Sequence, residues 1–486
     1  MTDLSITYAR LRATDPARWR EVAADWRRHA ATAERWAASI AAQLARVAAA
    51  WTGAAATAAT AQLERMRRMA VLIRLHCWSA DQALSEWAGA LERARAVLSR
   101  GVEMAGRAGL RLDDDGRVTP PVAPAFGQVT AQIQAALRIA AEADTATTGR
   151  LAELADSLMS NLGAPPPSAG PVPSANATPA QVGTWWAELT AEQRYWLAAT
   201  QPGWLGARDG IPAAFRDLAN RLLLDGHPDL AARLDDPAGP RGYLLHLDRD
   251  RLVLASGDPD AAASVLTHVP GMTADLASYA RELGRAETVA ARARELDPAT
   301  ATSAVLWLDY DAPGFVHEAA GKDRALAGAP ALRQFQEGLR ATHGDQAARL
   351  TVLGHSYGSL VVGSAAHSPG LEADAVVLVG SPGAGVEHAT DLAVPSVYAM
   401  SSLTDAVQYA TPAPVGLLKD LALNEVAGPL LAFGLPEDEL WHGHNPADPD
   451  FGARVVPSQP DAGHSGYWDP GRPALDGLAS VTLGRR

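Results

Sequence analysis

The sequence predicts an α/β protein in two parts, in which an all-α region precedes a mainly parallel sheet with helices on both faces. Apolar residues recur at steps of three and four between positions 19 and 98, which is typical of long helices packed along one side. Later in the chain, short β-branched runs alternate with helical patterns, as in a parallel sheet with crossover helices. A length of 486 residues favours two hydrophobic cores over one.

Composition and charge exclude several classes of function. A net charge of -13 argues against a nucleic-acid partner and against attraction to anionic membranes. No apolar run approaches the roughly 20 residues of a membrane span. The first residues show no basic stretch followed by an apolar core, so we expect no secretory signal and a cytoplasmic location.

The N-terminal region is predicted to be a helical hairpin. Asp15 and Pro16 form a helix start, and the apolar pattern breaks at 51–53. A heptad seam then continues over 63–98, so the two helices should fold back on each other. Cys77 lies in this seam, where a buried apolar role is expected rather than redox chemistry, and the tryptophans are expected to be core residues.

A long hairpin with a Trp-x-Gly bend, here Trp51 and Gly53, resembles the helical-hairpin proteins associated with type VII secretion. The resemblance covers residues 1–100 and implies a helical protein partner for the region 1–160. None of the nine tyrosines is followed four positions later by an acidic residue, which is the usual form of the export signal in that group. The resemblance therefore does not extend to export.

The segment 110–118 is predicted to be a small hairpin that turns at Asp115-Gly116. Its acidic run also suggests a calcium loop, but alternating ligands and a glutamate after the glycine are both missing. A further helix is expected over 126–158, and a linker rich in proline, alanine and serine follows it. The predicted domains are a helical domain at 1–160, a linker at 161–178 and an α/β domain at 179–486.

The α/β domain contains seven predicted strands, at 243–247, 252–254, 264–269, 305–308, 350–353, 375–379 and 397–400. Active sites of such sheets lie at the carboxyl ends of the strands. The run 415–436 has apolar clusters broken by charges, and it is predicted to be either a helical cap over the pocket or an ordinary packing helix.

The pentapeptide Gly-His-Ser-Tyr-Gly at 354–358 lies between a predicted strand and a predicted helix. Ser356 is expected at the bend with φ near or above zero, and the two glycines remove side chains that would collide where strand and helix converge. This is the geometry of a nucleophile elbow.

The chemical partners of such a serine follow in the order acid, then histidine. Asp405 comes after the last predicted strand, and His464 lies in a Gly-rich turn near the end of the sequence. His464 would take the Ser356 proton and return it to the leaving group, while Asp405 would fix the imidazole tautomer and stabilise its charge.

These assignments have rivals. Asp405 could instead cap a helix, and Asp391 is a second candidate acid in the preceding loop. His442 and His444 are alternative histidines that resemble a metal pair, but without an adjacent third ligand they indicate a solvated loop. We therefore predict no metal and no cofactor.

An oxyanion hole needs two backbone N–H groups. Tyr357, next after the serine, should supply one. The other should come from 269–272, where Pro270 has no N–H, and Met272 is preferred to Gly271.

Residues 180–486 resemble a bacterial α/β-hydrolase family of uncharacterised function. The resemblance rests on Asp-Gly-Ile-Pro at 209–212, Val-Pro-Gly at 269–271, Trp-Leu-Asp-Tyr-Asp-Ala-Pro at 307–313, the pentapeptide, and His-Ser-Gly-Tyr-Trp at 464–468. It implies the α/β-hydrolase fold and a serine-hydrolase triad at Ser356, Asp405 and His464. We expect hydrolysis of a small-molecule or lipid ester through an acyl-enzyme; the alternative is a non-catalytic binding protein that docks a partner through its hairpin.

Overall fold

The computed structural model describes residues 6–121, 123–163, 166, 168–237, 239–344, 348–409 and 439–486. The predicted cap at 415–436 lies outside the described residues. By its internal contacts the chain divides into two compact units. Unit 1 comprises Met1–Ala175, Thr184–Gly206 and Ala214–Gly242, and unit 2 comprises Asn176–Gly183, Ala207–Ala213 and Tyr243–Arg486. The domain boundaries drawn from the linker remain a prediction.

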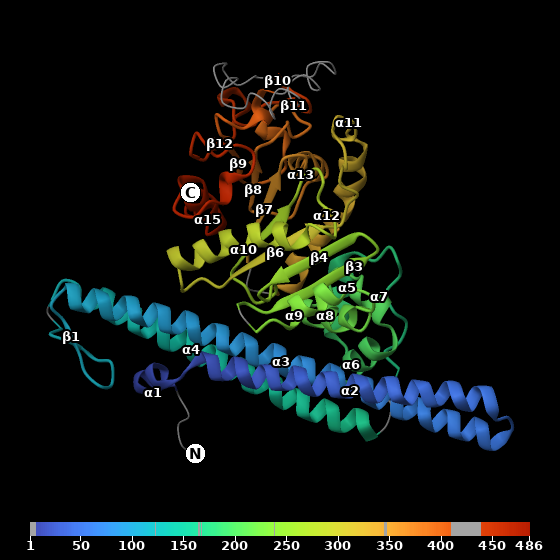
Figure 1. Ribbon diagram of the computed structural model, residues 1–486. Helices are drawn as coiled ribbons and strands as arrows, with labels where there is room; N and C mark the ends of the chain where they lie inside the picture. The colour runs from blue at the N-terminus through green and yellow to red at the C-terminus, as the bar shows by residue number, and fades with distance from the viewer. Residues whose placement is uncertain are drawn as a thin grey trace. The chain divides into compact units, whose positions relative to one another are not determined.

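Unit 1 is built on three long helices that run side by side (Figure 1). They are α2 (Pro16–Ala50), α3 (Ala54–Arg107) and α4 (Phe126–Gly163), preceded by the short α1 (Tyr8–Ala13). The Asp15 carboxylate accepts the N–H of Ala17 at 3.0 Å, which caps α2 as expected. The predicted hairpin with its bend at 51–53 is confirmed.

Most seam positions of α3 between Ala70 and Leu98 are buried, whereas Ile73 is half-buried and the earlier seam residue Met66 is exposed. Cys77 is 5% exposed, and burial raises the pKa of its thiol to about 11. The prediction that the tryptophans are core residues is wrong for Trp26, Trp36 and Trp51, which are exposed. The fully buried residues of α2 are its first proline and three alanines, and among its tryptophans Trp19, at the start of the helix, packs edge-on against Trp87 of α3.

A two-stranded hairpin follows α3, formed by β1 (Arg111–Leu112) and β2 (Val118–Thr119). The Asp113 side chain accepts the N–H groups of Asp115 and Arg117 at 3.0 and 2.8 Å. This carboxylate therefore closes the turn, as expected for a hairpin.

The remaining helices before the sheet are α5 (Pro179–Ala187), α6 (Ala191–Thr200), α7 (Pro202–Gly206), α8 (Ala213–Arg221) and α9 (Pro228–Asp235). Within unit 1, α6 packs against α3 and α4. A buried ion network ties residues 214–242 to the hairpin: Arg241 binds Asp81 at 2.9 Å and Asp217 at 2.8 Å, and Arg27 binds Asp81 at 2.7 Å.

Unit 2 contains an eight-stranded sheet in the order β12-β9-β8-β7-β5-β6-β4-β3. Its strands are β3 (Gly242–Asp248), β4 (Arg251–Ser256), β5 (Ser264–Val269), β6 (Thr302–Leu308), β7 (Arg349–His355), β8 (Ala375–Val379), β9 (Val397–Met400) and β12 (Arg454–Val455). Neighbouring strands in the run β12-β9-β8-β7-β5-β6 pair in parallel, whereas β4 pairs with β6 in antiparallel fashion. All seven predicted strands are confirmed. The sequence pattern missed β12 and the small pair β10 (Glu439–Leu440) and β11 (Gly443–His444), because two residues show no periodicity.

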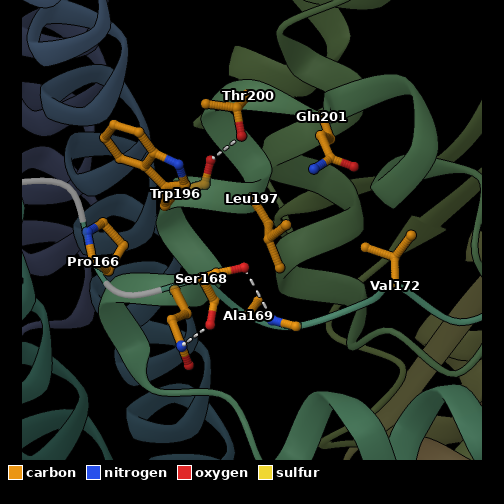
Figure 2. A pocket seen from close by; sticks show the side chains of 10 residues that line it. Pro166, Ser168, Ala169, Val172, Trp196, Leu197, Thr200 and Gln201 are labelled. Atoms are coloured by element: carbon orange, nitrogen blue, oxygen red, sulfur yellow. Dashed lines mark hydrogen bonds between the residues drawn. The ribbon is translucent and has the colours of Figure 1, made fainter.

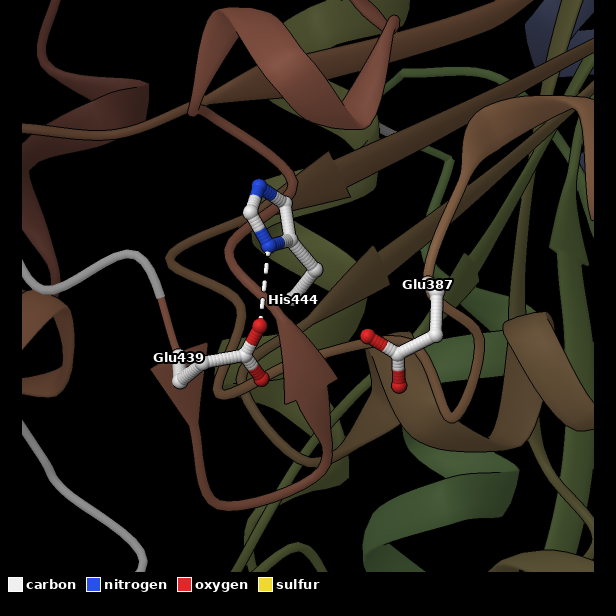
Figure 3. A group of neighbouring side chains, drawn as sticks. All are labelled: Glu387, Glu439 and His444. Carbon is white, nitrogen blue, oxygen red and sulfur yellow. Dashed lines mark hydrogen bonds and ion pairs between the residues drawn. The ribbon is translucent and has the colours of Figure 1, made fainter.

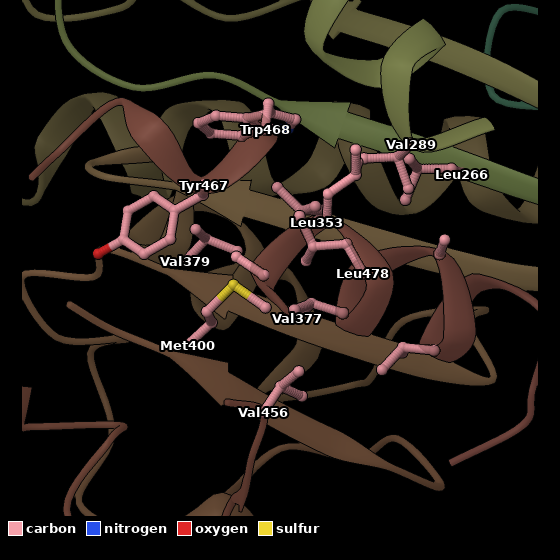
Figure 4. Packing of buried hydrophobic residues seen from close by; sticks show 14 of the residues in the cluster. Leu266, Val289, Leu353, Val377, Val379, Met400, Val456, Tyr467, Trp468 and Leu478 are labelled. Carbon is pink, nitrogen blue, oxygen red and sulfur yellow. The ribbon is translucent and has the colours of Figure 1, made fainter. Parts of the chain in front are cut away.

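Helices cover both faces of this sheet. The helices α10 (Tyr279–Leu296) and α15 (Pro473–Thr482) pack together on one face. The helices α12 (Asp323–Thr342) and α13 (Gly358–Ala366) pack together on the other face. A single helical turn, α11 (Val316–Ala319), precedes α12. Figure 4 shows the core under the first pair, where Leu353, Val377 and Met400 from neighbouring strands meet Val289 and Leu478 from the helices. Because β5, β7, β8 and β9 are parallel, the segments that follow them emerge at one edge of the sheet.

Among the helices of the described residues, none is long and apolar enough to cross a membrane.

Candidate active site

The turn between β7 and α13 holds Ser356 in a strained conformation. Its φ is 55°, a region that residues other than glycine rarely adopt, and its N–H donates to the Val379 carbonyl at 2.9 Å. Ser356 is partly exposed, whereas His355 and Tyr357 on either side are buried. The expected bend is therefore present, with one side chain of the turn open to solvent.

Backbone crowds this turn closely. A Cβ on Gly354 would lie 2.7 Å from the Gly358 carbonyl oxygen, so the glycines are needed for strand and helix to converge. A Cβ on Gly271 would lie 2.7 Å from the Ser356 Cβ and 2.9 Å from the Tyr357 nitrogen. The segment after β5 therefore runs directly against the serine and the amide that follows it.

The structure pairs His464 with Asp405. Asp405 follows β9, is fully buried, and accepts from His464 Nδ1 with its Oδ1 at 2.9 Å and its Oδ2 at 3.0 Å. The Val407 N–H also donates to Oδ1 at 3.1 Å, and the Tyr467 hydroxyl donates to Oδ2 at 2.6 Å. The imidazole remains about one third exposed, so a buried carboxylate holds a histidine that reaches solvent.

The His464 turn borders the serine through shared neighbours. His355 Nε2 donates to the His464 carbonyl at 2.9 Å, and the two rings are 4.7 Å apart. A Cβ on Gly380, next after the Val379 that receives the Ser356 N–H, would lie 3.2 Å from His464 Nδ1. Within the described residues no hydrogen bond joins Ser356 Oγ to His464. The structure thus brings serine, histidine and acid to the same edge of the sheet and hydrogen-bonds only the last two.

Comparison with known proteins agrees with this architecture. A family model described as alpha/beta hydrolase matches residues 248–415. An uncharacterized protein of Mycobacterium bovis is 34% identical over 211 residues, which cover 41% of this chain and 76% of that protein. The chain belongs to the alpha/beta hydrolase family.

A longer relative extends the similarity. An uncharacterized protein of Mycobacterium tuberculosis is 28% identical to this chain over 374 residues, which cover 63% of this chain and 55% of that protein. The chain therefore spans about half the length of this relative. No solved structure matches the chain.

The rival acid and one rival histidine have other partners in the structure. Asp391 ends the short helix η1 (Ala389–Asp391), where its carboxylate accepts the His388 N–H at 3.0 Å. His442 is 1% exposed and its Nε2 donates to the Ala319 carbonyl at 2.8 Å. Burial lowers the pKa of His442. The prediction of a solvated loop is wrong for this residue, because its ring packs edge-on against Tyr357.

The other rival, His444, belongs to a group of side chains that could hold a metal ion. Ligand atoms of Glu387, Glu439 and His444 lie within 4.8 Å of one another, and they form the one such group among the described residues (Figure 3). His444 Nδ1 lies 3.1 Å from Glu439 and Nε2 lies 3.3 Å from Asp448. Burial lowers the pKa of His444, but Glu439 and Asp448 raise it by more, so it lies above its ordinary value. A raised pKa opposes metal binding, because a metal needs the lone pair of a neutral imidazole. The structure brings to His444 the further ligand types that the sequence did not show, but both glutamates are exposed, and such groups are common without an ion. The absence of a metal stays a prediction.

A small cavity of about 140 Å³ lies within unit 1 (Figure 2). Pro166, Ser168–Gly170 and Val172 border it on one side, and Trp196 and Leu197 of α6 border it on the other. No charged side chain and no predicted site residue lines it.

Proposed function

We propose that this hydrolase is a serine hydrolase that cleaves carboxylic esters of small molecules or lipids through an acyl-enzyme on Ser356. The observation that carries the proposal is a strained, partly exposed serine beside a histidine whose other nitrogen is bound to a buried carboxylate. Family membership supports hydrolysis. No step of the proposed chemistry requires a cofactor.

The proposed reaction assigns one role to each residue. His464 Nε2 takes the Ser356 proton as Oγ attacks the ester carbonyl, and the imidazolium then protonates the leaving alcohol. Asp405 keeps the Nδ1–H tautomer, because it accepts from that nitrogen, and stabilises the charge that develops on the ring. Water then repeats the sequence on the acyl-enzyme and releases the acid.

The negative charge on the tetrahedral intermediate needs two donors near Ser356. The proposed donors are the backbone N–H groups of Tyr357 and Met272. The close approach of Gly271 to both Ser356 and Tyr357 supports this choice, because Met272 is the next residue along the chain.

The test is covalent labelling with a fluorophosphonate, which reacts with activated serines. Wild type should be labelled, and Ser356→Ala should lose both the label and several orders of magnitude in turnover of a short p-nitrophenyl ester. Ser465→Ala, which removes an exposed serine next to His464, is the matched control and should keep both. Near-normal turnover in Ser356→Ala would mean that the turn is structural.

The alternative function is a binding protein that uses the hydrolase fold as a scaffold and docks a helical partner through residues 1–160. The exposed Trp26, Trp36 and Trp51 on the hairpin favour it, because large apolar side chains at a surface are typical of interaction sites. A folded wild-type protein that the probe does not label would favour this alternative.

A further inference from the structure

The buried carboxylate of Asp405 depends on hydrogen bonds for its stability. Three groups donate to it: His464 Nδ1, the Val407 N–H and the Tyr467 hydroxyl. No arginine or lysine in the described part of the chain forms an ion pair with it. Because no arginine or lysine of the described residues neutralises this buried carboxylate, its negative charge is stabilised by the three hydrogen bonds. The Tyr467 hydroxyl therefore contributes a substantial share of that stabilisation.

Tyr467 is held where its hydroxyl must meet this carboxylate. It lies in the short helix η4 (Gly466–Trp468), three positions after His464, and its ring is fully buried in the core cluster. Figure 4 shows the ring at the border of the cluster, with its oxygen directed away from Val379. Burial, and then the Asp405 charge, raise the pKa of Tyr467 far above its ordinary range, so the hydroxyl stays a donor at every working pH.

We propose that Tyr467 is a positioning residue, whose hydroxyl fixes the Asp405 carboxylate against His464 and limits how strongly that carboxylate attracts a proton onto the imidazole. The proposal rests on the proposed function. The same turn of the chain then carries both the proposed base, His464, and the hydroxyl of Tyr467 that holds its partner Asp405 in position. No contact of Tyr467 with the substrate is required.

Other titratable and charged groups lie near the pair of His464 and Asp405. The His355 ring lies beside it, and burial keeps the pKa of His355 well below its ordinary value, so this neighbour is neutral. Burial raises the pKa of Tyr409, which lies near Asp405. The Arg285 guanidinium stacks on Trp468 at 4.6 Å and stays charged throughout. None of the three changes its charge between pH 5 and 8, so these neighbours add no step of their own to a pH profile in that window.

Tyr467→Phe removes one donor and leaves the ring in place. The carboxylate then attracts the Nδ1 proton more strongly, so the imidazolium is stabilised and the acid limb of kcat/KM moves to higher pH. With the carboxylate less constrained, kcat should fall by roughly tenfold, the effect of one hydrogen bond to a charged group. Asp405→Asn should move the limb in the opposite direction, because the charge itself is lost.

Tyr398→Phe is the matched control. Tyr398 is equally buried, belongs to the same cluster, and its hydroxyl donates to the Arg486 carbonyl instead of to Asp405. Tyr398→Phe should lower the stability of the protein without moving the acid limb of kcat/KM. A Tyr467→Phe profile that coincides with that of Tyr398→Phe would overturn the proposal.

Histidine NMR titration of the full-length protein separates this proposal from the proposed function, because it needs no turnover. The midpoint of the His464 titration should rise in Tyr467→Phe and stay at the wild-type value in Tyr398→Phe. An unchanged midpoint in Tyr467→Phe would refute the role of Tyr467 even in an active enzyme. A raised midpoint in a protein that the probe does not label would support that role and refute the esterase.

Discussion

The histidines of this protein differ in their access to solvent, and that difference separates structural rings from the proposed base. Burial lowers the pKa of His76, His355 and His442, so these rings are neutral donors and acceptors inside the fold. His464 is about one third exposed and rests on a carboxylate. A general base must exchange its proton during each turnover, and only the second environment allows this.

His76 provides a test of this contrast through stability. Its Nδ1 donates to the Leu72 carbonyl at 2.7 Å, its Nε2 accepts from Ser157 at 3.1 Å, and its ring stacks on Tyr195. Burial lowers the pKa of His76 from 6.5 to about 4. The unfolded chain therefore binds a proton between those values and the folded chain does not, so the stability that this residue contributes is complete above pH 6.5 and is lost as pH falls toward 4.

Over that window the loss approaches roughly 3 kcal/mol. Urea unfolding of His76→Gln at pH 7.5 and 5 should show a smaller pH dependence than wild type, while His29→Gln, at an exposed position of the same unit, should behave as wild type. Parallel pH dependences in all three proteins would contradict the assignment.

At the scale of elements, the parallel strands β7, β8 and β9 position the candidate site, because Ser356 follows β7, Asp405 follows β9, and the end of β8 lies against Asp405 and His464. Gly380, directly after β8, has a φ of 53°, and a Cβ there would lie 2.7 Å from Asp405 Oδ2 and 3.2 Å from His464 Nδ1. The end of this strand therefore leaves just enough room for the acid and histidine pair.

Gly380→Ala should displace this pair and lower esterase turnover by at least tenfold, since a misplacement of about 1 Å can reduce the rate by a hundredfold. Gly257→Ala is the matched control. It follows β4, has a φ of 81°, and its Cβ would meet nothing closer than 3.8 Å. The positive φ alone should cost both variants a similar stability, about 1 to 2 kcal/mol. An equal loss of turnover in both variants would show that backbone strain, and not displacement of the pair, lowers the activity.

At the scale of the whole chain, the buried ion network decides which segments fold together. Asp81 of α3 holds Arg241, the residue directly before β3, and also Arg27 of α2. Residues that follow the proline-rich segment in sequence therefore fold with the hairpin of unit 1. A buried charge that loses its partner destabilises a protein far more than an exposed one does.

Asp81→Ala should accordingly lower the free energy of unfolding by about 3 to 5 kcal/mol, because two arginines lose their carboxylate. Glu92, on the same helix as Asp81, forms a partly exposed pair with Arg20 of α2, and Glu92→Ala should lower the free energy of unfolding by less than about 1 kcal/mol. Chemical denaturation followed by circular dichroism measures both. Similar losses would mean that the network contributes no more than a surface pair.

Local patterns were sufficient for much of this fold. Helical spacing from 16 to 98 and β-branched runs after 243 predicted the hairpin and seven strands, because periodicity and propensity act between near neighbours in sequence. The elbow was predictable for the same reason, since Gly354, Ser356 and Gly358 shape a turn that they form by themselves. The order of acid and histidine came from resemblance to known hydrolases.

Contacts between distant segments decided the rest. The loop after β9 meets the loop after β12 because those strands pair, and Thr404 Oγ1 accepts the Gly463 N–H at 2.9 Å across 59 residues of sequence. That contact, absent from any local pattern, is why His464 bonds Asp405 and why Tyr467 reaches the same carboxylate. The sequence by itself determined the long helices of the hairpin, seven strands and the serine turn. The tertiary structure alone decided which acid faces the histidine, that His442 is buried and that three of the α2-hairpin tryptophans, Trp26, Trp36 and Trp51, are exposed. The physical reason is that burial and pairing depend on which surfaces meet in space, and a periodic pattern specifies a face without specifying its neighbour.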